Sequence, residues 1–335
     1  MAPVGPKRGG MDDPLEPLDR HPDAARIRSR KLDGGVATLI VDGSAMRNDE
    51  RKAMEARLDA AARAIPGVTE VRIALTSARK GVATLVAIGS GKGGVGKSTV
   101  AANLAVALVR LGKKVGLIDA DIYGPSQPTL LGAHDRPEAK DKQLISLVSP
   151  SGVRLLSVGQ LVPAGQALAW RGPMAGKALA QLIDGDWGDV DLILVDLPPG
   201  TGDVQLSLVQ KAKPAGAVIV STPQDLALID ATRAIDLFAR TDVPVLGIIE
   251  NMAGYVCPHC GEESDPFGSG GAEASARKLG IPFLGRLPLS AALREASDAG
   301  RPPAAEDGPA GDAFAVLARA LLDALDRSLG EKKPA

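Results

Sequence analysis

The sequence has little of three features that mark large classes of proteins: long apolar runs, an excess of charge of one sign, and cysteine. No stretch is long and apolar enough to cross a bilayer as a helix. Forty acidic residues balance 39 basic ones, so no overall charge attracts the chain to nucleic acid or to an anionic membrane. With only two cysteines in 335 residues, we expect a cytoplasmic protein, in which a close cysteine pair is more often a metal or redox site than a disulfide.

The first 24 residues are rich in proline, glycine and charge and contain no continuous apolar segment. This pattern fits neither a secretory signal nor a typical transit peptide, and it predicts a disordered tail. Apolar and polar residues then alternate on either side of residues 33–35, which is a hairpin signal. An amphipathic helix over 50–65 and a strand over 67–75 complete a predicted small α+β domain at residues 25–76.

A phosphate-binding loop is the most informative motif of the chain. It reads Gly91-Lys92-Gly93-Gly94-Val95-Gly96-Lys97-Ser98-Thr99. This is a Walker A pattern with a second lysine near its start. Its glycines let backbone N–H groups surround phosphates, Lys97 reaches the terminal phosphates, and the Ser98 hydroxyl can ligate Mg²⁺. A β-rich run before the loop and a helical segment after it aim a helix N-terminus at an anion. The loop therefore predicts a nucleotide such as ATP, Mg²⁺ and, through Lys92, a second subunit.

Strand and helix patterns alternate after the loop. Apolar, β-rich runs lie at 114–119, 153–158, 191–196, 216–222, 244–250 and 282–285. Their alternation with helical segments predicts an α/β P-loop NTPase domain over residues 82–329, with a mostly parallel sheet and helices on both faces. Residues 330–335 are expected to be a tail. The last helix, 312–329, has an apolar stripe, but its polar face is not polybasic, so we expect it to dock on the core and not on a membrane.

Acidic residues end two of the apolar strands. Asp119 and Asp121 close the strand at 114–119, and Asp196 closes the strand at 191–196 as a Walker B acid would. Ligands of α/β sheets bind at this edge. We expect Asp119 and Asp196 to hold Mg²⁺, the latter through a water, and Asp121 to order the attacking water. Gly200, in the loop that follows Asp196, offers an N–H group for the γ-phosphate, and such loops rearrange when that phosphate leaves.

The two cysteines form a pair, Cys257-Pro-His-Cys260. Two thiols at this spacing can bind one metal ion or two corners of a cluster, and thiolates select iron–sulfur clusters, Zn²⁺ or Cu(I). A redox dithiol would normally open a helix in a thioredoxin-like context, whereas this pair follows a strand in a glycine-rich loop. His259 is either a further ligand or a spacer, and we favour the spacer. Zn²⁺ and [4Fe-4S] sites usually take four ligands, so a closed four-cysteine site needs two chains.

Taken together, the motifs resemble the Mrp/ApbC P-loop ATPases that carry iron–sulfur clusters, within the wider MinD/ParA class with its deviant Walker A loop. The resemblance covers about residues 82–328 and is carried by the segments 91–99, 119–126, 170–174, 196–203, 250–252, 257–260 and 282–288. It implies that Lys92 reaches the nucleotide of the opposite subunit and that Asn251 hydrogen-bonds adenine. It also implies that the cysteine pairs of two subunits bridge one [4Fe-4S] cluster.

The function expected from this resemblance is a homodimeric ATPase that transfers its cluster to apo iron–sulfur proteins after receiving it from a scaffold. Lys92, Lys97 and Asp121 are the expected catalytic residues. The small N-terminal domain resembles a shortened form of the one that often precedes this ATPase, but it reads Met-Arg-Asn-Asp-Glu at 46–50 in place of the usual Asp-Pro-Glu stretch. Two alternatives stay open: a ParA/MinD-type positioning ATPase, and a zinc-bridged regulatory ATPase.

Overall fold

The computed structural model describes residues 13–43, 46, 48–76, 83–140, 143–161 and 172–331. It divides into two compact units, Met1–Val82 and Ala83–Ala335, and each is treated by itself below. Parts of three expectations lie outside the described residues: the tail over 1–12, the tail over 332–335, and positions 170 and 171 of the motif at 170–174.

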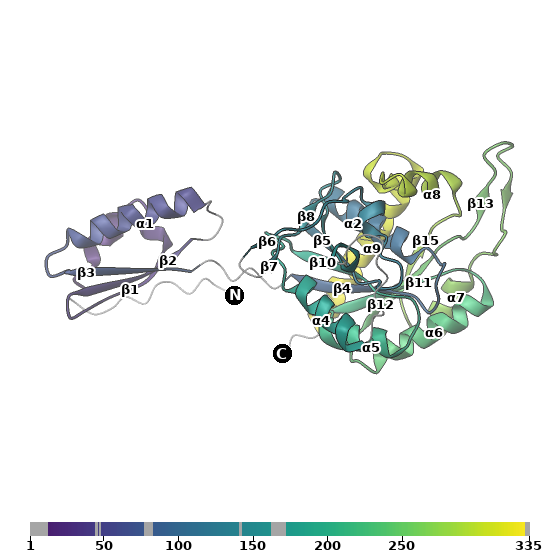
Figure 1. Ribbon diagram of the computed structural model, residues 1–335, viewed down its shortest axis with the longest axis horizontal. Helices are drawn as coiled ribbons and strands as arrows, with labels where there is room; N and C mark the ends of the chain where they lie inside the picture. The colour runs from purple at the N-terminus through teal and green to yellow at the C-terminus, as the bar shows by residue number, and fades with distance from the viewer. Residues whose placement is uncertain are drawn as a thin grey trace. The chain divides into compact units, whose positions relative to one another are not determined.

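The first unit is a three-stranded sheet covered by one helix (Figure 1). Strands β1 (Ile27–Asp33) and β2 (Val36–Asp42) are antiparallel and joined by a tight turn at Gly34 and Gly35, both with positive φ. The hairpin expected here is confirmed. Helix α1 (Asn48–Arg63) then carries the chain back, so that β3 (Glu70–Thr76) pairs parallel to β2.

Residues 13–24 are not a disordered tail, and this corrects the expectation from their composition. They form the 3₁₀ helix η1 (Glu16–Arg20) and lead into η2 (Ala24–Arg26). Leu15 and Leu18 are fully buried in the core of the first unit, with residues of β2 and α1. Residues three apart lie on one face of a 3₁₀ helix, so two leucines suffice to anchor a segment that is otherwise charged.

We predict that Leu18→Ala destabilises the first unit by about 2–5 kcal/mol, because the substitution leaves a cavity under β2. Hydrogen exchange followed by mass spectrometry should show faster exchange of the β2 amides. Glu16→Ala, at an exposed position of the same 3₁₀ helix, is the control and should leave exchange unchanged. Equal protection of β2 in both variants would show that residues 13–24 do not belong to this core.

The second unit is built on an eight-stranded sheet with the order β15-β12-β11-β4-β10-β5-β9-β8. All neighbouring strands are parallel except β8 and β9. The strands are β4 (Thr84–Gly89), β5 (Val115–Asp119), β8 (Leu147–Val148), β9 (Arg154–Ser157), β10 (Leu192–Asp196), β11 (Gly216–Ser221), β12 (Val245–Glu250) and β15 (Phe283–Arg286). The strand that follows β4 in the sequence, β5, lies on one side of β4 in the sheet, and the later strand β11 lies on the other side. The carboxyl end of β4 is therefore at the crevice where such sheets bind ligands.

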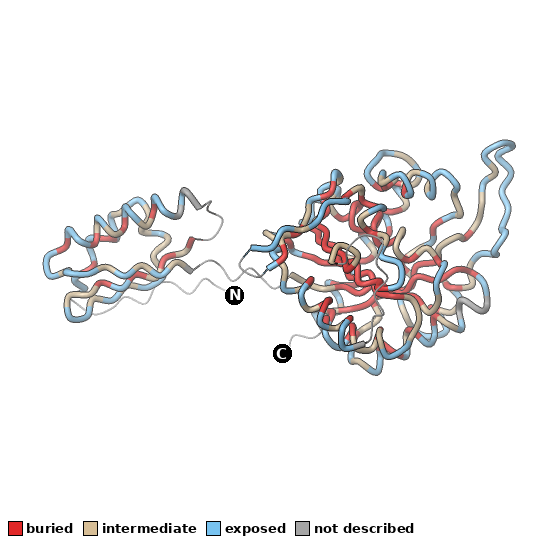
Figure 2. Tube along the Cα trace, in the orientation of Figure 1, coloured by how far each residue is buried: buried red, intermediate tan, exposed pale blue. Residues whose placement is uncertain are grey.

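Helices cover both faces of this sheet, as expected (Figure 2). One face packs against α2 (Lys97–Arg110) and α9 (Pro309–Glu331). The other packs against α4 (Gly172–Ile183), α5 (Asp203–Ala212), α6 (Asp225–Ala239) and α7 (Gly271–Leu279). Helix α9 docks its apolar stripe, including Phe314 and Leu317, in the core. It begins at Pro309 and continues to Glu331, past the expected end at residue 329.

The remaining elements are short. They are α3 (Gln127–Leu130), β6 (Ala139–Lys140), β7 (Gln143–Leu144), η3 (Val158–Leu161), β13 (Tyr255–Val256), β14 (Glu263–Ser264), α8 (Ala291–Asp298) and η4 (Pro303–Ala305). The antiparallel pair β13–β14 forms a hairpin that projects from the body of the second unit (Figure 1). Across the described ranges, every helix is too short or too polar to span a bilayer.

Candidate functional site

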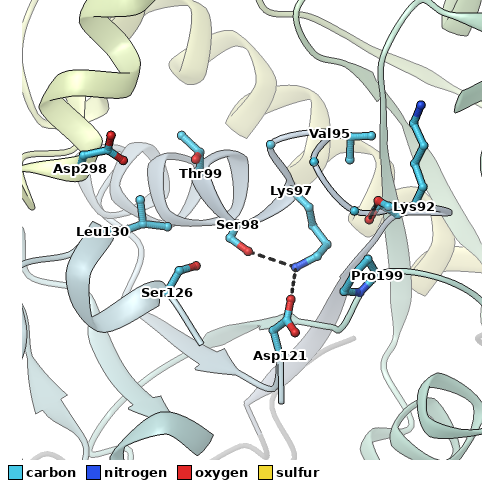
Figure 3. Close-up of a pocket in the computed structure, with 14 residues that line it drawn as sticks. Lys92, Val95, Lys97, Ser98, Thr99, Asp121, Ser126, Leu130, Pro199 and Asp298 are labelled. Carbon is cyan, nitrogen blue, oxygen red and sulfur yellow. Dashed lines mark hydrogen bonds and ion pairs between the residues drawn. The ribbon is translucent and has the colours of Figure 1, made fainter. Parts of the chain in front are cut away.

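The phosphate loop connects the end of β4 to the start of α2 and borders a cavity of about 290 Å³ (Figure 3). The cavity is lined by Ser90, Lys92 to Thr99, Asp121, Ser126, Leu130, Pro199 and Asp298. Gly96 has a φ of 79°, and a Cβ there would lie 2.3 Å from Nδ2 of Asn251. A side chain at Gly91 would meet the backbone of Asp230 at 2.1 Å. The loop thus needs glycine both for its path and for close packing.

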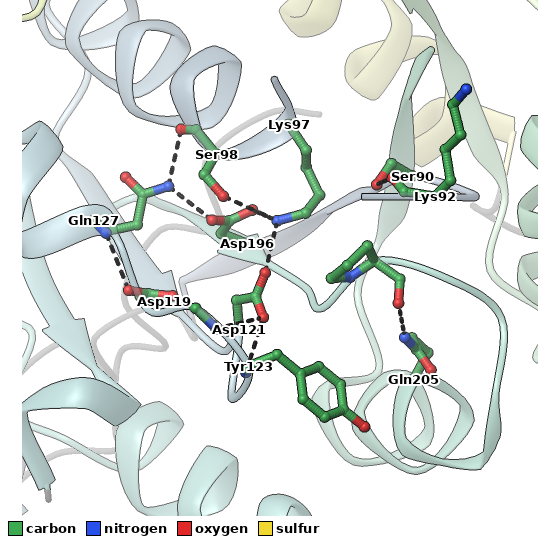
Figure 4. A network of polar contacts seen from close by, with 12 residues as sticks. Ser90, Lys92, Lys97, Ser98, Asp119, Asp121, Tyr123, Gln127, Asp196 and Gln205 are labelled. Atoms are coloured by element: carbon green, nitrogen blue, oxygen red, sulfur yellow. Dashed lines mark hydrogen bonds and ion pairs between the residues drawn. The ribbon is translucent and has the colours of Figure 1, made fainter. Parts of the chain in front are cut away.

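Lys97 lies between oxygen atoms at the floor of the cavity (Figure 4). Its Nζ forms a short ion pair with Oδ1 of Asp196, lies 3.7 Å from Oδ2 of Asp121, and donates to Oγ of Ser98 at 3.1 Å. The Lys97 side chain is only 5% exposed and that of Asp196 is fully buried. A buried ammonium needs such partners, and Asp196 supplies the carboxylate that balances the charge of Lys97.

Asp119 and Asp196 are neighbours because β5 and β10 are parallel and in register, with these two residues paired at the strand ends. Both are fully buried. Asp119 accepts hydrogen bonds from the Ser157 hydroxyl at 2.9 Å and from the backbone N–H groups of Gln127 and Asp121 at 3.1 and 3.2 Å. Burial, and then the nearby Asp196, raise the pKa of Asp119 to about 7. A cation bound at this edge would favour the ionised form.

The oxygen donors expected to hold magnesium come together at this edge. Ser98, Asp119 and Asp196 bring a hydroxyl and two carboxylates to one end of the sheet. Among the residues that the structure describes, no three His, Cys, Asp or Glu side chains gather into a group that could hold a metal by themselves. Magnesium usually takes only one or two carboxylates and completes its shell with waters and phosphates. The donor set therefore fits Mg²⁺ bound together with a nucleotide.

Three other expected nucleotide ligands are engaged elsewhere or point away. The Gly200 N–H donates to the Ser90 carbonyl at 3.0 Å, so it must exchange this partner before it can bind a γ-phosphate. The Asn251 amide donates to the Val95 carbonyl of the phosphate loop at 2.9 Å. The Lys92 ammonium is directed away from Lys97 and Asp121 (Figures 3 and 4). Of the two lysines in the loop, only Lys97 turns toward the aspartates of its own chain.

Two buried glutamines of the site were not anticipated from the sequence. Gln127 hydrogen-bonds Asp196, Ser98 and Asp119. Gln205 donates a short hydrogen bond to the Pro199 carbonyl in the loop that carries Gly200. The signal in the sequence was a polar residue shortly after a strand-end motif. Gln127 lies eight residues after Asp119, and Gln205 is the third residue of α5, behind the glycine loop.

The cysteine pair lies on the β13–β14 hairpin. Cys257 is partly exposed and Cys260 is exposed. The turn is closed by the Gly261 N–H to the Cys257 carbonyl at 2.8 Å and by the Cys257 N–H to the Glu262 carbonyl at 2.9 Å. Hydrogen bonds from the backbone N–H groups of Cys260 and His259 lower the pKa of the Cys257 thiol. A thiolate is the form that ligates metals, so the hairpin presents two candidate metal ligands, one exposed and one partly exposed.

Comparison with known proteins agrees with this geometry. Residues 81–322 match the family model described as ParA: NUBPL iron-transfer P-loop NTPase. The chain belongs to this family. An iron-sulfur cluster carrier protein of Deinococcus radiodurans is 45% identical over 320 residues, covering 91% of this chain and 90% of that protein. The membership confirms the family expected from the motifs.

Solved structures share the fold of the second unit. A nucleotide-binding protein of Archaeoglobus fulgidus in complex with ADP is 41% identical, with a TM-score of 0.60, and covers 68% of this chain and 89% of that one. The MinD cell division protein of Aquifex aeolicus is 28% identical, with a TM-score of 0.53, and covers 75% of this chain and 99% of that one. The second unit is therefore a P-loop NTPase of the MinD/ParA type.

We predict that Lys97→Met destabilises the second unit by about 3–5 kcal/mol, because it leaves the buried carboxylate of Asp196 without its counter-charge. Both tryptophans, Trp170 and Trp187, belong to this unit, so tryptophan fluorescence during urea unfolding reports on it alone. The double variant Lys97→Met/Asp196→Asn should regain most of the lost unfolding free energy, since neither buried charge remains. If Lys97→Met unfolds at the same urea concentration as the wild type, the buried pair does not exist.

Proposed function

We propose that this chain acts as a homodimer that binds and hydrolyses MgATP and carries a [4Fe-4S] cluster, as cargo, between the cysteine pairs of its two subunits. The observation that carries this proposal is an open pair of thiols, one with a lowered pKa, on a hairpin of an otherwise complete P-loop NTPase. Two thiols per chain are half of a four-thiolate site. A second copy of the chain supplies the other half most directly.

At the nucleotide end, each polar group has a distinct role in the proposed reaction. Lys97 leaves Asp196 for the terminal phosphates, and the backbone of the phosphate loop surrounds them. Ser98, Asp119 and Asp196 hold Mg²⁺, which neutralises charge on the phosphates when it is bound. Asp121 orients the attacking water. Lys92, which is directed away from Lys97 and Asp121 in its own chain, reaches the nucleotide of the second subunit.

The base of the cysteine hairpin offers a route by which nucleotide could affect the cluster. Glu250 ends β12 and accepts hydrogen bonds from the N–H groups of Gly270 and Ala272, at the start of α7. Its neighbour Asn251 donates to the phosphate loop. One end of the segment that carries Cys257 and Cys260 thus contacts the phosphate loop through Asn251, and the other end is bonded to the adjacent Glu250. A base that captures the Asn251 amide would release this contact and shift the hairpin relative to the loop.

We propose that this coupling serves cluster transfer: the protein receives the cluster from a scaffold and passes it to apo iron–sulfur proteins. Hydrolysis then acts as a switch between subunit arrangements, and the cluster is the transferred group. The cluster carrier of Deinococcus radiodurans, with 45% identity over nearly the whole of both chains, supports this proposal. The position of the thiols supports it as well, because Cys260 is exposed and Cys257 partly exposed, and a cargo site must be accessible to the recipient protein.

We predict that Cys257→Ala and Cys260→Ala each abolish cluster binding but leave ATP binding intact, because the thiols lie on the hairpin and not in the nucleotide cavity. The measurement is anaerobic reconstitution with iron and sulfide, followed by counting about four irons per wild-type dimer. His259→Ala is the matched control from the same turn and should retain the cluster. Stoichiometric iron in Cys257→Ala, or zinc with no visible absorbance in the wild type, would contradict the proposal.

A further inference from the structure

Gln127 occupies an unusual place beneath the nucleotide cavity. It begins α3, and its side chain is completely buried. Its Nε2 donates to Oδ2 of Asp196 at 2.8 Å and to the Ser98 carbonyl at 3.0 Å. Its backbone N–H donates to Oδ2 of Asp119 at 3.1 Å. One residue therefore contacts all three of the proposed magnesium ligands (Figure 4).

The orientation of the Gln127 amide is fixed by its partners. Both groups that face Nε2 are acceptors, a carboxylate and a carbonyl, so a flipped amide would direct Oε1 against two oxygens. In the orientation observed, Oε1 is buried and has no hydrogen-bond partner within the described part of the chain. An unpaired buried oxygen costs stability. That cost is accepted in a position where the amide holds a buried carboxylate and a backbone carbonyl of the phosphate loop.

The two oxygens of Asp196 are held by different kinds of partner. Oδ1 pairs with the Lys97 ammonium, and Oδ2 accepts from the Gln127 amide. Lys97 is the residue that must turn toward the phosphates when a nucleotide binds. Gln127 has no such second task. When Lys97 leaves, Gln127 remains the one side-chain donor to Asp196 among the described residues, and, being neutral, it leaves the negative charge of Asp196 available to a cation.

We propose that Gln127 is a positioning residue for the magnesium site: its amide fixes the Asp196 carboxylate and the Ser98 backbone in the geometry that Mg²⁺ requires once Lys97 has moved to the phosphates. This inference rests on the proposed binding of MgATP. Groups that orient a metal's ligands commonly change metal affinity or activity by about 10- to 100-fold when they are removed. The effect should fall on the metal and not on the nucleotide.

Gln127→Met tests the proposal, because methionine fills similar space without a donor and without the unpaired oxygen. Mn²⁺ serves as the probe for the metal, and its binding to the full-length protein with ADP is titrated by electron paramagnetic resonance. We expect the variant to bind Mn²⁺ about 10- to 100-fold more weakly and to be somewhat less stable to heat, because Oδ2 of Asp196 loses its buried donor. ADP affinity in EDTA should change less than about twofold, because the phosphate loop itself is intact.

Two further variants make the result decisive. Gln127→Asn keeps an amide but is one methylene shorter, so it cannot reach Asp196 and should also lose Mn²⁺ affinity. Gln143→Met removes an exposed glutamine that bonds the Asp184 carbonyl and should behave as the wild type. Unchanged Mn²⁺ affinity in a folded Gln127→Met or Gln127→Asn protein would overturn the inference while leaving the proposed function standing. Absence of Mn²⁺ binding in the wild type would overturn the proposed metal site, and this inference with it.

Discussion

The buried ion pair between Lys97 and Asp196 is the interaction on which the site depends. Taking both charges out of water is costly, and such a pair contributes little net stability, although breaking one side of it is strongly destabilising. What the pair provides is a fixed position for the Lys97 ammonium next to the phosphate loop. Lys97 lies inside the protein, and three neighbouring aspartates lie with it at one sheet edge. In the proposed function, the same ammonium passes to a phosphate and leaves Asp196 to a metal.

This exchange fits the rest of the second unit. The sheet register brings Asp119 next to Asp196. Gln127 donates to the oxygen of Asp196 that does not pair with Lys97, and the Gly200 N–H donates to the Ser90 carbonyl. Each of these groups thus has a partner within the protein, and in the proposed function it exchanges that partner for a phosphate or a metal. Asn251 extends the pattern toward the cysteine hairpin, since its amide donates to the Val95 carbonyl at the point where β12 leads into the segment that carries the cysteines.

Much of this could be predicted from the sequence, because its informative parts are local. The phosphate loop is one contiguous motif, and acids that end parallel strands meet at one edge whatever the loops between them do. The pairing of Lys97 with Asp196, 99 residues apart, and the contacts of Gln127 depend on tertiary packing and have no local pattern. Residues 13–24 have no local pattern that predicts their order, because two leucines among many charges give a weak hydrophobic signal, although both leucines are fully buried.

The most direct test of the account is the affinity of Asp196→Asn for ATP in the absence of divalent metal. If Lys97 must leave Asp196 to reach the phosphates, the variant should bind metal-free ATP more tightly than the wild type, because that contact no longer competes. Asp119→Asn is the control, and both variants are measured at pH 8.5, where the Asp119 carboxyl, with its pKa of about 7, is ionised. This substitution removes a nearby charge that does not pair with Lys97, so it should change the affinity for ATP less. Equal or weaker binding by Asp196→Asn in calorimetric titration would contradict the exchange.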